Sequence, residues 1–203
     1  MTVECPEYYL ASSLPFGFTY GQWTVTWWRW ALSTSKSVNP VLDESGRYAS
    51  IGQPEKFVWF LSGRFGTEGT NFPKRFCTVP VGRSILFPVI NYEANSLEYP
   101  ELITEGDLVE NVRKVEDTIT KKECIVDGTR IEAQRVESDP LIFDLDINEN
   151  SPLNTAKLGH TLAAADGYWV FLRPLHPGDH FISFEGSCEK GKLRSGAIYH
   201  IHI

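Results

Sequence analysis

The chain has 203 residues, of which 42% are hydrophobic and 22% are charged, and its formal net charge at pH 7 is −7. These proportions are typical of a soluble globular protein with one domain, residues 1–203, and no apolar run approaches the roughly 18 residues of a membrane span. Because the 19 basic residues are scattered through an acidic chain, nucleic-acid binding is excluded as a function.

The amino terminus, Met1 to Glu7, has neither the basic region nor the apolar segment of a secretory signal. We therefore expect a cytoplasmic protein as the sequence is written, and an extracellular one if the given chain is a mature form. The cysteines lack the C-x-x-C spacing of zinc or redox sites, so structural thiols are expected, and disulfides remain open for an exported form. They are Cys5, Cys77, Cys124 and Cys188.

Four of the six tryptophans lie within residues 23–30. Thr19 and Gln22 form a capping-box pattern ahead of them, and three tryptophans then recur at helical spacing: Trp23, Trp27 and Trp30. This pattern predicts a helix that ends before Asn39-Pro40, with those three indoles in the core and Trp28 pointing elsewhere. A strand is the alternative, because residues 24–26 are β-branched.

A second helix is predicted from Thr104, which is followed by Asp107 in the first turn. One apolar face continues along the predicted helix through Leu108, Val112, Val115 and Ile119. Lys121 and Lys122 then stand where the helix dipole favours cations, so the helix is expected to extend to this point.

The rest of the chain reads as short strands bounded by Gly, Pro and Asp. The predicted strands are 57–61, 84–90, 141–145, 168–172, 180–184 and 197–203. Asp127-Gly128 is a two-residue hairpin signal, and residues 176–179 have the composition of a tight turn. We therefore expect an antiparallel β-sandwich, jelly-roll or immunoglobulin-like, with two helical insertions.

Several local patterns together resemble a family of uncharacterised microbial proteins. They are Tyr20-Gly21-x-Trp23, Trp27-Trp28-x-Trp30-Ala31-Leu32, Asn39-Pro40, Gly52-Gln53, Trp59-Phe60-Leu61-x-Gly63, Cys77-Thr78-Val79-Pro80-x-Gly82, Leu86-Phe87-Pro88-Val89-Ile90-Asn91, Asp166-Gly167-Tyr168-Trp169-Val170 and Pro174-Leu175-x-Pro177-Gly178-x-His180. The resemblance spans most of the chain and implies a compact β-sandwich, often exported, with no established activity. This chain departs from the family in lacking an export signal and a cysteine at residues 47–49, which argues against a disulfide at Cys77.

Histidines supply one possible metal site. His200 and His202 share a face of a predicted strand, and His180 begins a strand that can pair with it. The alternative, which we favour, is that all three are solvated or hydrogen-bonded surface side chains, so no metal or other cofactor is expected.

The pattern Asp144-x-Asp146-x-Asn148 copies the first ligand positions of a calcium-binding EF-hand loop. Glu149 and Thr155 then stand where that loop requires Gly and Glu. A polar loop after a strand is the better interpretation.

Acid–base chemistry is the remaining possibility, because nucleophile, phosphate-loop and dinucleotide motifs are absent from the sequence. Glu93 and Asn91 follow a strongly apolar strand, and Glu44 lies in the loop after the tryptophan helix. A carboxyl group beside aromatic walls acquires a raised pKa and can act as a general acid or base. The structural alternative is that Asn91 and Glu93 cap a turn and that Asp43 and Glu44 are solvated.

The leading functional hypothesis is a binding or structural module whose partner is a small molecule or carbohydrate. Its expected ligand-binding side chains are Trp28, Trp59 and Tyr92. A cofactor-independent hydrolase of glycosides or esters is the alternative, with Glu93, Glu44 and Asn91 as its catalytic residues.

Overall fold

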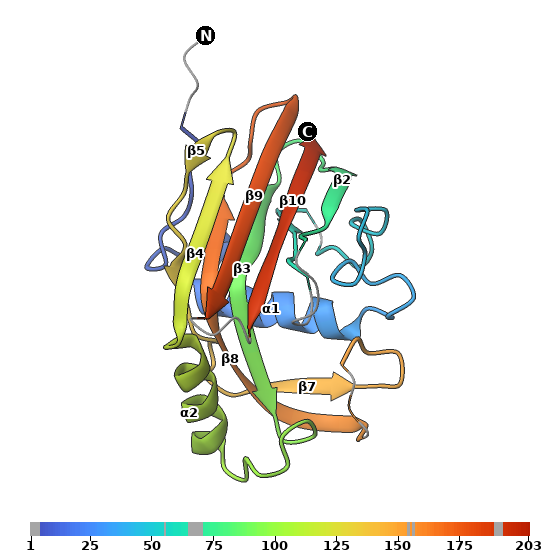
Figure 1. Cartoon of the computed structure of the whole chain (residues 1–203), viewed down its shortest axis with the longest axis vertical. Helices are drawn as coiled ribbons and strands as arrows, with labels where there is room; N and C mark the ends of the chain where they lie inside the picture. Colours follow the sequence, from blue (N-terminus) through green and yellow to red (C-terminus); the bar gives the residue numbers. More distant parts are fainter. Residues whose placement is uncertain (1–4, 55, 65–70, 154, 156, 189–192) are drawn as a thin grey trace.

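Strands predominate in the part of the chain that the structure, a computed structural model, describes: residues 5–54, 56–64, 71–153, 155, 157–188 and 193–203. The helices described are the 3-10 helix η1 (Pro15–Gly17) and the α-helices α1 (Tyr20–Ser33) and α2 (Glu105–Glu116) (Figure 1). The described strands are β1 (Val58–Phe60), β2 (Lys74–Thr78), β3 (Ser84–Asn95), β4 (Ile119–Val126), β5 (Thr129–Arg130), β6 (Gln134–Arg135), β7 (Phe143–Ile147), β8 (Gly159–Leu172), β9 (Asp179–Cys188) and β10 (Arg194–His202). A mainly β chain with two α-helices is thus confirmed for these residues.

The strands form two mixed sheets, so the wholly antiparallel arrangement that we expected is wrong. One sheet has the order β1-β3-β8-β6 with β7 also paired to β8, and the other has the order β2-β10-β9-β4-β5. β1 runs parallel to β3, and β2 runs parallel to β10. The reason is that β2, which lies between β1 and β3 in the chain, belongs to the other sheet, and such a crossover lets β1 and β3 run the same way.

The long strands β3 and β8 are buried on both faces. Phe87 and Val170 join a core cluster with Phe184 and Tyr199 of the second sheet. On the opposite face, Leu86 and other side chains pack against the tryptophans of α1. Three layers therefore follow one another: the second sheet, the first sheet and α1 (Figure 1).

Helix α1 begins as predicted, since Thr19 and Gln22 form a reciprocal capping box. Trp27 and Trp30 are buried, and their indole nitrogens donate to backbone carbonyls. Trp23 is only half-buried, and Trp28, which we expected to point away from the core, is 4% exposed. The aromatic cluster therefore extends around more of the helix than one apolar face.

Helix α2 also begins as predicted, with a capping box between Thr104 and Asp107, but it ends at Glu116. The prediction that it continues past Ile119 to the lysine pair is wrong, because those residues belong to β4. Lys121 pairs with Glu185 of the neighbouring strand β9 at 2.7 Å. Cross-strand pairing therefore replaces the interaction with a helix dipole.

The Asp127-Gly128 hairpin is confirmed, since both residues have positive φ, 49° and 80°, and connect β4 to β5.

The segment 173–178 joins β8 to β9, which lie in different sheets. Asp144 and Asp146 lie on the exposed face of β7, and the polar loop expected after this strand begins later, at Asn148. β2, β6 and the first half of β8 were not predicted, because β2 and β6 are short and largely polar and the apolar run of β8 before Asp166 is mostly alanine, which is uncommon in strands.

Candidate functional site

A cavity of about 230 Å³ lies beside β3 beyond the end of β1. We call it the Glu93 cavity; its walls include Trp28 of α1, Asn91, Tyr92 and Glu93 of β3, and Glu98 and Tyr99 from the turn that follows. β1 pairs only with Ser84–Leu86, and a β-bulge between Pro88 and Ile90 shifts the register of β3 against β8 before the strand reaches the cavity. Such bulges re-aim the side chains that follow.

Glu93 is the central titratable group of this cavity. It is 5% exposed, and its Oε1 accepts a hydrogen bond from Asn95 Nδ2 at 3.0 Å. Burial, reinforced by the nearby carboxyl of Glu98, raises the pKa of Glu93 to about 8, against the opposing effect of the Asn95 hydrogen bond. The carboxyl is therefore predominantly protonated at neutral pH and can donate a proton.

Glu98 provides a second carboxyl on the same wall. Its Oε2 accepts from the same Asn95 nitrogen at 2.8 Å, and burial raises its pKa as well. Asn95 Oδ1 in turn accepts from the backbone N–H groups of Leu97 and Glu98. The turn is thus capped by Asn95, so the alternative in which Asn91 and Glu93 cap it is wrong.

Aromatic side chains form much of the remaining wall. The rings of Tyr92 and Tyr99 lie 6.3 Å apart, and burial together with a hydrogen bond to Tyr99 raises the pKa of Tyr92. Trp28 lies on the same wall, and its Nε1 has no acceptor among the described residues. Asn91 Nδ2 likewise lacks a described acceptor. Buried donors of this kind are uncommon and mark places where a water or ligand atom completes the hydrogen bonds.

Two arginines also line the Glu93 cavity, and each is paired with a glutamate outside the wall. Arg64 Nη2 donates to both carboxylate oxygens of Glu44, at 2.9 and 3.0 Å. Arg194 Nη2 donates to Glu185 at 3.2 Å, and its guanidinium lies 4.4 Å from the ring centroid of Phe72.

The structure therefore brings four of the sequence-predicted site residues to one cavity: Trp28, Asn91, Tyr92 and Glu93. Glu44 is placed outside it, bound to Arg64 with 63% of its side chain exposed. Trp59 lies in the core between the sheets, with Arg83 over its ring. Asp43 is not solvated as the alternative required, because its carboxylate is buried and accepts from Ser45 and Tyr48.

Sequence reasoning missed seven wall residues: Arg64, Glu98, Tyr99, Leu153, Leu193, Arg194 and Ser195. The pattern Glu93-x-Asn95-x-x-Glu98 contained a signal for the second carboxyl, since an Asn that caps a turn holds nearby side chains together. The two arginines left no local signal, because their segments reach the cavity only through tertiary packing.

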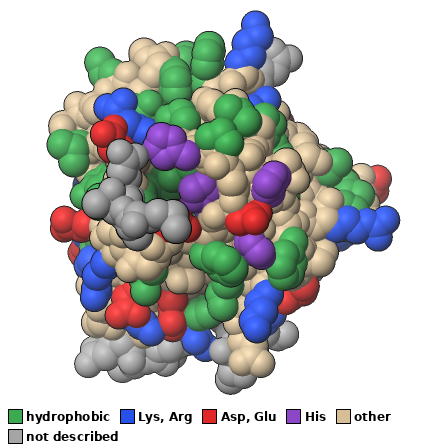
Figure 2. Space-filling model, turned by 90° about the horizontal axis from the view of Figure 1, so that it is seen from above, with side chains coloured by type: hydrophobic (Ala, Val, Ile, Leu, Met, Phe, Trp, Pro, Cys, Tyr) green, Lys and Arg blue, Asp and Glu red, His purple; other side chains and the backbone are tan. Residues whose placement is uncertain are grey.

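The histidines gather at the end of the molecule where β10 terminates, and Figure 2 shows several imidazoles close together there. His180 is bonded to Asp127 at 2.6 Å and to the carbonyl of His176 at 2.7 Å. His202 pairs with Asp179 at 2.8 Å, while His200 stacks on Phe181. In the described part of the chain, His, Cys, Asp and Glu side chains nowhere form a group of three or more suited to a metal ion.

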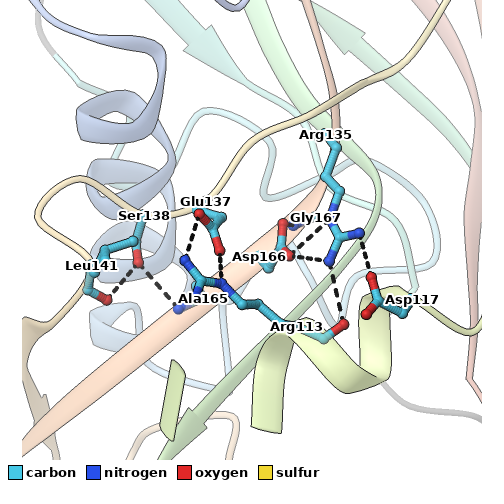
Figure 3. Close-up of polar contacts among 9 residues, drawn as sticks. All are labelled: Arg113, Asp117, Arg135, Glu137, Ser138, Leu141, Ala165, Asp166 and Gly167. Atoms are coloured by element: carbon cyan, nitrogen blue, oxygen red, sulfur yellow. Dashed lines mark hydrogen bonds and ion pairs between the residues drawn. The ribbon is translucent and has the colours of Figure 1, made fainter. Parts of the chain in front are cut away.

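A second cluster of charges, on the α2 side of β8, consists of internal ion pairs (Figure 3). Arg135 binds the buried Asp166 at 2.7 Å and also reaches Asp117 at the end of α2. Arg113 pairs with Glu137. These contacts attach α2 to β6 and β8, and so they support the scaffold behind the Glu93 cavity.

Cys5, Cys77 and Cys124 are free thiols, and Cys124 is buried. Burial raises the pKa of Cys124 to about 12. A thiol of this kind is unreactive at neutral pH and serves as a small apolar side chain.

Among the described residues, neither α-helix has the length and apolarity needed to cross a lipid bilayer.

No protein-family model matches the chain, and neither the curated proteins nor the solved structures contain a significant match. The geometry of the Glu93 cavity therefore provides the basis for assigning a function.

Proposed function

We propose that this protein binds a small polar molecule in the Glu93 cavity, and that its two sheets act as a β-sandwich frame that holds the cavity walls in place. The observation that carries the proposal is the meeting of Trp28 from α1 with Glu93 and Glu98 around one cavity. Apolar walls with a few convergent polar groups and a shifted pKa are typical of ligand sites.

The size of the cavity limits the ligand. Its volume of about 230 Å³ is below the ~300–1,000 Å³ of pockets for drug-sized molecules. A molecule the size of one sugar ring or one amino acid fits this space.

Thermal-shift screening with small polar molecules tests this proposal, followed by calorimetry on any molecule that raises the melting temperature. Trp28→Leu and Glu93→Gln should each weaken binding at least tenfold. Glu110→Gln is the matched control, because Glu110 lies on the exposed surface of α2, paired with Lys114. Binding that is unaffected by both cavity variants would place the ligand elsewhere and overturn the proposal.

General acid catalysis is a second candidate function, and the protonated state of Glu93 favours it. A carboxyl that holds its proton near neutral pH can protonate a leaving-group oxygen, while Glu98 is positioned as a second carboxyl that can activate water. In this hydrolase, Glu98 takes the role that the sequence suggested for Glu44.

The hydrolase candidate is tested by assaying glycosides and esters with the purified chain and with Glu93→Gln. The variant should lose roughly 10²–10⁴-fold in turnover, the usual contribution of a general acid, while remaining folded. Equal turnover by both proteins would exclude Glu93 as the acid.

A further inference from the structure

Two buried hydrogen-bond donors on the wall of the Glu93 cavity have no acceptor among the described residues. They are Nε1 of Trp28, in α1, and Nδ2 of Asn91, in β3. Trp28 is only 4% exposed, so its side chain has little contact with solvent. A buried donor without a partner costs free energy. The cavity therefore favours an occupant that brings oxygen acceptors.

Carboxyl oxygens on the same wall favour the opposite kind of group. Glu93 and Glu98 each accept one hydrogen bond, from Nδ2 of Asn95. An ionised carboxylate has roughly four acceptor positions, so one hydrogen bond leaves room for a donor on the ligand. A ligand carboxylate only accepts, and it would bring a like charge close to Glu98. The cavity therefore also favours an occupant that donates.

The arginines on the wall are matched within the protein. Arg64 pairs with Glu44 and Arg194 pairs with Glu185, so the ligand need not supply an anion for them. An ammonium ligand would suit the carboxyl groups, but it has no acceptor atom and would leave the two buried donors unmatched. A hydroxyl group both donates and accepts, and so it serves both sets of groups.

Aromatic rings form an apolar surface between these polar groups. The rings of Tyr92 and Tyr99 lie 6.3 Å apart, and both tyrosines pack against a cluster that includes Leu108 and Val112 of α2. This packing holds the two rings in the wall. A ring-shaped ligand with an apolar face fits against such a surface while polar groups at its edge meet the protein donors and acceptors.

We infer that the ligand of the Glu93 cavity is a neutral monosaccharide, whose hydroxyl groups accept from Trp28 and Asn91 and donate to Glu93 and Glu98. This inference rests on the proposed binding function and names the class of ligand. One pyranose ring combines groups that donate and accept, the absence of charge and an apolar ring face. The cavity, at about 230 Å³, has room for one such ring.

Calorimetry on the full chain tests the assignment with free sugars. Neutral aldohexoses and aldopentoses are screened first, and the best binder is then compared with its uronic acid and its deoxy derivatives. We expect the uronic acid to bind at least tenfold more weakly, because it adds a negative charge beside Glu98. At least one deoxy derivative should lose about tenfold in affinity, since it leaves a buried donor unpaired again.

Trp28→Phe isolates the contribution of the indole N–H, because it keeps an aromatic ring in the wall. Binding of the sugar should weaken about tenfold. Trp59→Phe is the matched control and should leave the affinity unchanged. Trp59 is also 4% exposed, and its Nε1 also lacks an acceptor in the described structure, but it lies in the core between the sheets and outside the cavity.

Asn91→Leu removes the second donor at a similar side-chain size. We expect the affinity for the sugar to fall about tenfold here as well. Asn111→Leu is the matched control, because Asn111 is likewise half-buried and its Oδ1 lacks a partner among the described residues, but it belongs to α2 and does not line the cavity. Circular dichroism checks that all four variants are folded.

The outcomes separate this inference from the function beneath it. If an amine or an amino acid binds in a manner sensitive to Glu93→Gln while every sugar fails, the sugar is wrong and the binding function stands. Sugar binding that Trp28→Phe and Asn91→Leu both leave unchanged, or a uronic acid that binds as tightly as its parent, would also overturn the inference. If none of these probes and no other small polar molecule binds, both are wrong.

Discussion

Glu93 and Glu98 accept hydrogen bonds from one and the same nitrogen, the side-chain Nδ2 of Asn95, at 3.0 and 2.8 Å. Two carboxyl groups held this close do not ionise independently, because the charge on one disfavours the charge on the other. The pair therefore retains a proton in the pH range where an exposed glutamate is fully ionised. This relationship makes the Glu93 cavity chemically distinct from the charged clusters that serve only the scaffold.

The stability of the protein should decrease as the pH rises. The pKa of Glu93 is about 8 in the folded state and near 4.5 in the unfolded chain, so between these values the folded state binds more protons and ionisation favours unfolding. The loss should reach a few kcal/mol, at about 1.4 kcal/mol per pKa unit. Urea unfolding at pH values from about 5 to 9 measures it.

Glu93→Gln should reduce this pH dependence, since an amide does not titrate, while the raised pKa of the buried Glu116 maintains part of it. Glu110→Gln should leave it unchanged. A wild-type stability that is constant over the range would show that Glu93 is not protonated in the folded protein.

Trp27→Ala should lower the free energy of unfolding by about 3–5 kcal/mol, because it leaves a cavity in the core. Trp27 is 2% exposed and donates to the carbonyl of Leu61. Phe76→Ala is the control, since that ring is 61% exposed on the outer sheet, and a change within about 0.5 kcal/mol is expected. Equal effects in denaturant unfolding would contradict the core assignment.

Two glycines should respond to alanine in opposite ways. At Gly186 of β9 an added Cβ overlaps Ile90 of β3, so Gly186→Ala should cost about 1–3 kcal/mol. At Gly106 of α2 a Cβ meets only Thr104 Oγ1, at an ordinary 3.6 Å, so Gly106→Ala should stabilise by about 0.4–1 kcal/mol. Melting temperatures that move in the same direction would argue against this packing of the sheets.

Protein purified without a histidine tag should contain well under one transition-metal ion per chain. The physical reason is that His180 and His202 each pair with a separate aspartate and His200 stacks on an aromatic ring. Elemental analysis measures the content. A full equivalent of zinc that disappears in the His200→Ala, His202→Ala double variant would refute this prediction.

Features determined by short-range interactions were readable from the sequence. The capping boxes at Thr19 and Thr104 and the hairpin at Asp127-Gly128 each involve residues within a few positions of one another. Their hydrogen bonds and backbone angles follow from local chemistry, so the starts of both helices and this turn were predicted correctly. The end of α2 was not, because cross-strand contacts with β9 compete there with the helical pattern.

The sequence by itself also pointed to Glu93 and Trp28 as side chains with chemical potential, because a carboxyl after an apolar strand and a dense run of indoles are unusual in a globular chain. Only the tertiary structure decided that these two line one cavity, that Glu98 and not Glu44 is the second carboxyl, and that Arg64 and Arg194 reach the same walls. Strand pairing across long stretches of chain sets these positions, and parallel pairs such as β2 with β10 leave no local trace in the sequence.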